Sequence, residues 1–209
     1  MMDEGYIKYQ CQWVQTSALP QNQVSNLMQY RDRLYRLGLV GQYPNGIGFG
    51  NVSQRLSKQS STFIVSGTQT GHLPTLTPEH YATVTAFDLD RNWLACSGPI
   101  RASSEALTHA VIYQISPETQ AIIHVHHAGL WQTLMHQVPT TAASVPYGTP
   151  EMAQEMARLL QSSGARMGPT MRSQTLIMAG HEEGLITFGD TLSEAYTVLM
   201  AHYQTWKSA

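Results

Sequence analysis

Three histidines have the type and spacing expected of a metal site. His124 and His126 are two residues apart at the end of residues 121–126, a run rich in β-branched residues. In a β-strand, side chains two apart point to the same face, so both imidazoles can reach one ion. Imidazole is a preferred zinc ligand, and three protein ligands with one open position are typical of catalytic zinc. We predict that His181, in a glycine-flanked loop, is the third ligand.

Glu105 is the carboxylate that the sequence places nearest to this strand. It begins the helix expected to lead into residues 121–126, and a helix N-terminus favours negative charge, so a purely electrostatic role is an alternative. The histidine pair likewise has an alternative role as hydrogen-bonded structural residues. His109 lies four residues after Glu105, and we interpret it as part of an i,i+4 side-chain pair rather than as a ligand.

The composition excludes several classes of function. Apolar residues make up 42% and charged residues 12% of the 209 residues, and the formal net charge is -2. The chain is too apolar to be disordered, and its basic residues form no block that would bind nucleic acid or anionic lipid. No stretch approaches the ~20 apolar residues that span a bilayer, and the acidic residues 1–4 do not resemble a secretory signal. We expect a cytoplasmic protein of one domain, residues 1–209, without nucleic-acid or membrane partners.

The two cysteines, Cys11 and Cys96, are far apart in the sequence. Neither belongs to a C-x-x-C pair, which argues against a disulfide framework and against a thiolate zinc site. A metal is therefore expected to bind through histidines and carboxylates.

Hydrophobic periodicity and capping residues predict the elements that position these side chains. Helices are expected at residues 22–37, at a short segment from 77, and at 103–115, 149–160 and 191–206. Strands are expected at residues 51–56, 61–65, 84–89, 93–96, 121–126, 175–178 and 185–188. Because a hairpin interrupts the alternation of helices and strands, a layered α/β domain with a mixed sheet is favoured over a purely parallel one.

Two segments look like cofactor or ion loops without meeting the requirements. The glycines of residues 46–50 suggest a dinucleotide loop, but a strand follows them where that motif needs a helix, which makes NAD binding improbable. Residues 88–92 begin like a calcium loop, but Pro99 stands where its glutamate belongs, so a hairpin turn is the better interpretation.

Four motifs occur in a fixed order along nearly the whole chain. They are Gly50-Asn51-Val52-Ser53, Ser66-Gly67 with Thr70-Gly71, Ser103-Ser104-Glu105, and His124-Val125-His126 followed by His181. In this order the sequence resembles the class II sugar-phosphate aldolases and their relatives, the ribulose-phosphate epimerases, methylthioribulose-phosphate dehydratases and the adducin head domain. The resemblance implies a single three-layer α/β/α domain with a central mixed, mainly antiparallel sheet. It also implies a homotetramer with sites at subunit interfaces.

The resemblance assigns roles that agree with the spacing argument. The three histidines would bind Zn²⁺, with Mn²⁺ or Fe²⁺ as alternatives, and Glu105 would be the acid/base. Phosphate-binding roles carry over to Asn51, Ser66, Gly67, Ser103 and Ser104. Backbone N–H groups in such turns and at a helix N-terminus attract anions, although each of these residues also has a plainer interpretation as a turn or cap residue.

The implied activity is that of a metal-dependent lyase in carbohydrate metabolism. It would act on a small sugar phosphate or related hydroxycarbonyl compound, by aldol cleavage or dehydration through a metal-stabilised enediolate. A pentulose-phosphate epimerase and a non-catalytic interaction domain like the adducin head are the alternatives. Two features depart from the family pattern. Glu182 and Glu183 separate His181 from Gly184, whereas the glycine directly follows this histidine in many relatives, so they could reposition His181 or offer the metal a carboxylate. Tyr147 is only a weak counterpart of the proton-donating tyrosine of the aldolases, which weakens aldol cleavage specifically.

Overall fold

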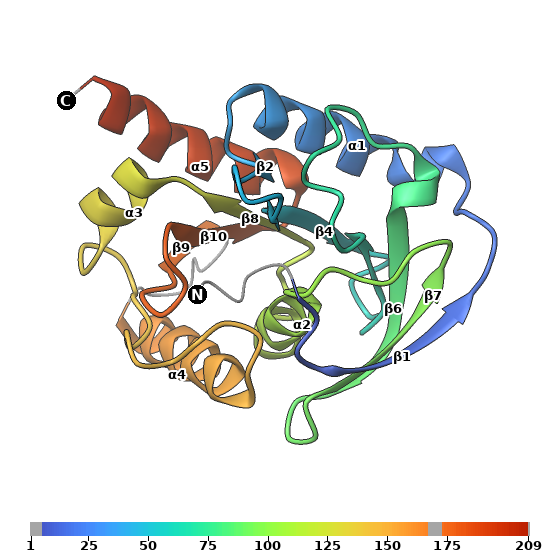
Figure 1. Ribbon diagram of the computed structural model, residues 1–209. Coiled ribbons are helices and arrows are strands. Elements are labelled where there is room, and N and C mark those ends of the chain that lie inside the picture. Colours follow the sequence, from blue (N-terminus) through green and yellow to red (C-terminus); the bar gives the residue numbers. More distant parts are fainter. Residues whose placement is uncertain (1–5, 167–172, 209) are drawn as a thin grey trace.

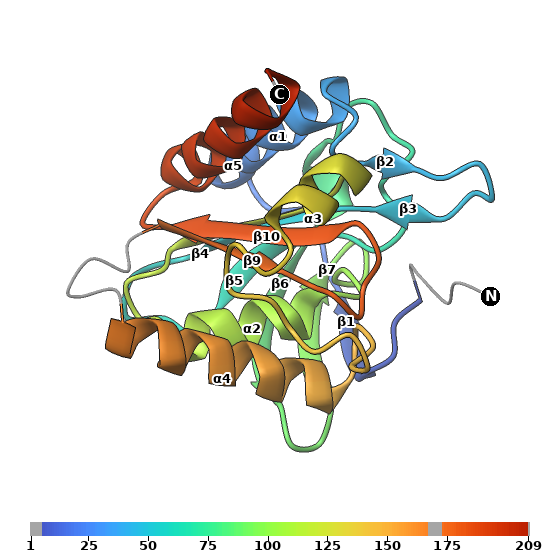
Figure 2. The same ribbon diagram turned by 90° about the vertical axis from the view of Figure 1, so that its left-hand side faces the viewer.

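The protein has three layers, with a sheet between two groups of helices (Figure 1). The computed structural model describes residues 6–166 and 173–208, so residues 1–4, which were not expected to form a secretory signal, lie outside the described part. One face of the sheet is covered by α1 (Gln21–Arg36), α3 (Ala128–Leu134) and α5 (Leu192–Lys207), and the other by α2 (Ala106–Ile115) and α4 (Pro150–Arg166), as Figure 2 shows. None of the helices described is long and apolar enough to cross a membrane.

Eight strands form the sheet in the described part of the chain. In chain order they are β1 (Gln10–Gln15), β4 (Asn51–Arg55), β5 (Phe63–Ser66), β6 (Tyr81–Asp88), β7 (Trp93–Gly98), β8 (Ala121–His126), β9 (Ser173–Ile177) and β10 (Gly184–Gly189). Their spatial order is β1-β7-β6-β5-β4-β8-β10-β9. Only the β1–β7 pair is parallel among these described neighbours. The mixed, mainly antiparallel sheet and the three layers predicted from the sequence are confirmed.

Strand β8 lies near the middle of the sheet and is buried throughout. Its alternation divides the side chains between the two cores, because successive residues of a strand point to opposite faces. Ile123 and Val125 pack in the core beneath α1 and α5, and Ile122 packs in the core beneath α2 and α4. The same alternation places His124 and His126 on the α2 side, where the start of α2 carries Glu105.

Several elements were not predicted from the sequence. They are the edge strand β1, the short helix α3 and a two-stranded ribbon of β2 (Gly41–Gln42) and β3 (Gly48–Phe49). Parallel pairing of β1 with β7 also brings Cys11 and Cys96 together as free thiols, with their Sγ atoms 3.9 Å apart. Distance along the sequence was therefore a poor guide to their separation in space.

Three predicted helix starts differ in detail from the structure. The segment from residue 77 forms only a single 3-10 turn, Pro78–His80. Ser103 and Ser104 were expected to cap α2, but Glu105 occupies the N-cap position, and the Ser103 hydroxyl accepts the Glu105 backbone N–H at 3.2 Å. At α5 the Thr191 hydroxyl caps the helix as expected, whereas the Glu194 carboxylate accepts from the N–H of Asp190 rather than that of Thr191.

The buried side chain of Arg31 joins α1 to the loop that follows β5. Its guanidinium donates to the carbonyls of Thr70 at 2.9 Å, Gly71 at 3.0 Å and Leu73. In Arg31→Met these buried acceptors lose their donor, so we expect the free energy of unfolding to fall by about 2–4 kcal/mol. Urea unfolding measures this free energy. Arg31→Lys keeps the positive charge but not the planar guanidinium group that contacts several carbonyls at once, so it should lose less stability than Arg31→Met. A loss below ~1 kcal/mol in Arg31→Met would contradict this role of Arg31.

Candidate metal centre

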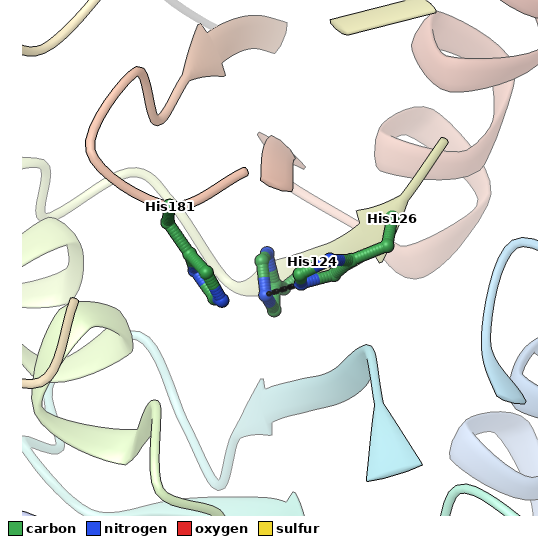
Figure 3. Close-up of side chains that lie close together, drawn as sticks. All are labelled: His124, His126 and His181. Atoms are coloured by element: carbon green, nitrogen blue, oxygen red, sulfur yellow. Dashed lines mark hydrogen bonds between the residues drawn. The ribbon is translucent and has the colours of Figure 1, made fainter. Parts of the chain in front are cut away.

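The three predicted histidines converge on one point (Figure 3). One nitrogen of each ring lies within 4.8 Å of the others, and His124, His126 and His181 are all buried. Two come from β8, and the third comes from the turn between β9 and β10. Antiparallel pairing of β8 with β10 places Gly184 opposite His126. The turn between β9 and β10, which carries His181, therefore lies next to the end of β8.

The hydrogen bonds of the two strand histidines fix which nitrogens carry protons. His124 Nδ1 lies 3.1 Å from the carbonyl oxygen of Leu185, which can only accept, so this nitrogen bears the proton. The Tyr43 hydroxyl donates its proton to the Glu183 carboxylate at 2.9 Å, and therefore accepts from His126 Nδ1, also at 2.9 Å. In the neutral rings both Nε2 atoms then carry lone pairs.

These two lone pairs face each other at 3.1 Å, the contact drawn as a dashed line in Figure 3. With no proton between them, two acceptors at this distance repel each other unless a positive charge lies nearby. The donor set therefore fits a divalent cation, which neutral imidazoles ligate through the nitrogen that lacks a proton.

Burial keeps both strand histidines in this neutral form. Removal from water holds the pKa of His124 well below its ordinary value, and the neighbouring His181 lowers it further. The pKa of His126 is lowered in the same way, by burial first and then by His181 and His124. These two ligands can therefore bind a cation without first losing a proton.

A pocket of about 390 Å³, including its open mouth, surrounds the cluster. Four of the five residues assigned to phosphate binding line it, together with Glu105 and the three histidines: Asn51, Gly67, Ser103 and Ser104. Ser66 is not among them, because its buried hydroxyl accepts the backbone N–H of Val52 at 3.2 Å. The Asn51 Oδ1 atom is buried and has no hydrogen-bond partner in the described part of the chain.

Glu105 is buried to 3% exposure in the wall of this pocket. Thr108, one turn further along α2, donates its hydroxyl to Glu105 Oε2 at 2.9 Å. The carboxylate does not belong to the group of mutually close metal-ligating atoms found in the described residues. Glu105 thus shares the pocket with the three histidines without belonging to their close group of ligand atoms.

Close backbone packing brings a further aromatic side chain to His181. A Cβ on Gly180 would lie 1.8 Å from the carbonyl oxygen of Val145, so only glycine allows the two loops to approach. This approach stacks the Tyr147 ring on His181, with centroids 4.4 Å apart. Tyr147 also lines the pocket, and the Lys8 ammonium lies 3.9 Å from the centroid of its ring.

Comparison with known families agrees with this geometry. Residues 26–207 match the family model of the class II aldolase and adducin N-terminal domain. The chain belongs to this family. Class II aldolases depend on a metal, and the three histidines form a group that could hold one.

Solved structures show that the fold of this class II aldolase family member is shared. It resembles YgbL from Escherichia coli at 20% identity and a TM-score of 0.64, covering 90% of this chain and 87% of that one. An L-fuculose 1-phosphate aldolase matches at 16% identity and a TM-score of 0.65, with 90% and 84% coverage. The L-fuculose-1-phosphate aldolase of Thermus thermophilus matches at 21% identity and a TM-score of 0.57, with 88% and 95% coverage. None of the curated proteins matches the chain.

Glu182 and Glu183, which separate His181 from Gly184, leave His181 within the cluster. The side chain of Glu182 is exposed, whereas the Glu183 carboxylate accepts the hydroxyl of Tyr43. Neither joins the close group of ligand atoms among the residues described. Tyr43 was not predicted, because it contacts His126 across 83 positions and lies in a glycine-rich loop without a recognisable motif.

His109 lies behind the pocket and links α2 to β4 in this class II aldolase family member. Its Nδ1 atom is 2.7 Å from the Ser53 hydroxyl, which is 2.8 Å from the hydroxyl of Tyr113. His109 Nε2 is buried without a partner in the part of the chain described. The residue lies outside the ligand cluster, as predicted, but its Nδ1 atom contacts Ser53 of β4 rather than the predicted i,i+4 partner Glu105.

Burial lowers the pKa of His109 from 6.5 to about 3, which predicts a dependence of stability on acid. Between these values the unfolded chain binds a proton that the folded protein does not, so stability falls as pH falls, by up to about 1.4 kcal/mol per pH unit. We expect metal-free His109→Asn to lose less stability than metal-free wild type between pH 6 and pH 4, in urea unfolding. Parallel pH curves for the two proteins would contradict the prediction.

Proposed function

We propose that this protein is a zinc-dependent lyase acting on a small sugar phosphate or related hydroxycarbonyl compound, by aldol cleavage or dehydration. The observation that supports this most directly is the pair of Nε2 atoms 3.1 Å apart, with His181 beside them. Three imidazoles favour zinc over manganese, which prefers oxygen ligands. The buried carboxylate of Glu105 in the same pocket supplies the second requirement of this chemistry.

Bound by these histidines, a divalent cation would supply Lewis-acid polarisation of a substrate carbonyl. Glu105 would accept the proton that a hydroxycarbonyl substrate loses as its enediolate forms, and would return one later in the cycle. The Thr108 hydroxyl holds one carboxylate oxygen of Glu105, which fixes the orientation of the carboxylate in the pocket wall. Burial of the whole cluster excludes bulk water and strengthens these interactions.

The phosphate group would bind on the side of the pocket formed by small residues. Gly67 and the Ser103–Ser104 segment at the start of α2 present hydroxyls and backbone groups there. The described lining includes neither lysine nor arginine, so N–H groups, hydroxyls and the helix N-terminus would provide the attraction. The buried Oδ1 of Asn51 would accept a substrate hydroxyl.

The test combines metal analysis with product detection. Protein purified without chelators should contain about one equivalent of zinc, and should convert members of a panel of ketose and aldose phosphates to cleaved or dehydrated products in a chelator-sensitive reaction. Epimerised products alone would replace the lyase assignment by an epimerase. Protein that neither retains nor binds zinc would favour a non-catalytic role like that of the adducin head.

A further inference from the structure

We propose that Tyr43 and Glu183 form a hydrogen-bonded relay that positions His126 as a metal ligand. The inference rests on the proposed metal site and extends it to two residues that do not touch the cation. Glu183 is one of the two residues between His181 and Gly184, so this short segment gains a function of its own.

The direction of the relay follows from its donors and acceptors. The carboxylate of Glu183 takes the only proton of the Tyr43 hydroxyl, at 2.9 Å. The hydroxyl oxygen can then only accept from His126 Nδ1, so this ring carries its proton on Nδ1 and presents Nε2 to the cluster. Metal-ligating histidines commonly donate their second ring N–H to a carboxylate or carbonyl, which fixes the ring orientation. In this protein the Tyr43 hydroxyl lies between the His126 imidazole and the Glu183 carboxylate and hydrogen-bonds to both.

The surroundings hold both relay residues in place. The Tyr43 ring packs against Phe49, with centroids 4.5 Å apart, and the centroid of Phe49 lies 5.5 Å from that of the His126 ring. Glu183 has a φ of 64°, a left-handed conformation that residues other than glycine rarely adopt. Its backbone carbonyl accepts the N–H of His127 at 3.0 Å, and this hydrogen bond holds the turn next to the residue that follows β8.

The two strand histidines, His124 and His126, differ in the group that accepts the hydrogen bond from Nδ1. The Leu185 carbonyl accepts from His124 Nδ1, and because that carbonyl belongs to β10, the sheet itself orients His124. The ring of His126 lies at the strand end, where its hydrogen bonds include one with the Tyr43 hydroxyl and one with the backbone of Glu182. The Tyr43 contact is therefore the one that a substitution can remove.

Metal affinity tests the relay. Tyr43→Phe keeps the ring and its packing and removes only the hydroxyl, so zinc affinity measured by competition with a chromophoric chelator should fall about 10- to 100-fold. Glu183→Gln keeps an acceptor oxygen and should fall less than Glu183→Ala. Tyr30→Phe, on the opposite layer in α1, is the matched control and should bind zinc like wild type. The visible spectrum of the Co²⁺-substituted protein should change in Tyr43→Phe and Glu183→Ala and stay as in wild type in Tyr30→Phe.

The metal-free proteins give a readout that needs no bound ion. ¹⁵N NMR of the wild type should show His126 protonated on Nδ1, and Tyr43→Phe should show a larger share of the other tautomer. Wild-type zinc affinity in both Tyr43→Phe and Glu183→Ala would overturn the relay while leaving the metal site intact. A wild type that binds no zinc would overturn the metal site itself, and the ligand-positioning role with it.

Discussion

Replacing Glu105 with Gln is expected to lower kcat by about 10²- to 10⁴-fold while leaving the zinc content unchanged. Glutamine occupies nearly the same volume and can still accept the Thr108 hydroxyl, whose oxygen lies 2.9 Å from the carboxylate. It cannot take up a proton, so the step that forms the enediolate loses its base. Steady-state kinetics and elemental analysis of the same preparation measure the two effects separately.

Two controls distinguish a lost base from a disturbed pocket. Glu118→Gln makes the same chemical change on an exposed residue and should leave kcat and zinc content as in the wild type. Thr108→Val removes the partner hydroxyl but keeps the carboxylate, so its kcat should fall less than that of Glu105→Gln. Turnover at the wild-type rate in Glu105→Gln would remove this residue from the mechanism, whatever the metal content.

The sequence predicted those parts of the site that depend on local periodicity. Alternation along residues 121–126 requires His124 and His126 to share a face, and in the structure that face points toward α2. Glu105 was expected at the start of α2 for the same kind of reason, although it occupies the N-cap rather than the first turn. Strand β8 and helix α2 are regular elements, so the spacing of residues within them transfers directly into space.

Contacts between distant segments could not be predicted in this way. Tyr43 and Glu183 are 140 positions apart, and only the folded sheet places the glycine-rich loop over the turn before β10. The same holds for Cys11 and Cys96, which the parallel pairing of β1 with β7 brings together. Such contacts depend on which strands become neighbours, and the periodicity of a single segment carries no information about its neighbours.

The resemblance to the family assigned phosphate-binding roles to a third group of residues, and only some of them line the pocket. Gly67 lines the pocket, where an added Cβ would lie 2.5 Å from the Ile100 side chain, whereas its neighbour Ser66 turns its hydroxyl to the backbone of β4. A family motif marks a short stretch of chain rather than the orientation of each side chain in it. Adjacent residues of an extended segment point to opposite sides, so one motif can supply both a pocket residue and a structural contact.

Replacing His124 with Ala is expected to abolish stoichiometric zinc binding and, with it, detectable turnover. The variant leaves two imidazoles, and catalytic zinc sites are built on three protein ligands. Zinc at a thousandfold excess over its Kd should stabilise the wild type by about 4 kcal/mol, because it binds only the folded protein. Urea unfolding with and without zinc should show this gain in the wild type and none in His124→Ala.

The stability of the metal-free proteins sharpens this test. His124 is buried and bonded to the Leu185 carbonyl, so its removal leaves a cavity and an unpaired acceptor, yet it also relieves the repulsion between two lone pairs 3.1 Å apart. The metal-free variant should therefore lose less stability than the cavity and the unpaired carbonyl alone would cost. His72→Ala, which removes an exposed histidine outside the cluster, should keep the full zinc-dependent gain. An equal gain in His124→Ala would show that zinc binds elsewhere, and the convergence of the three imidazoles would then need an explanation without a metal.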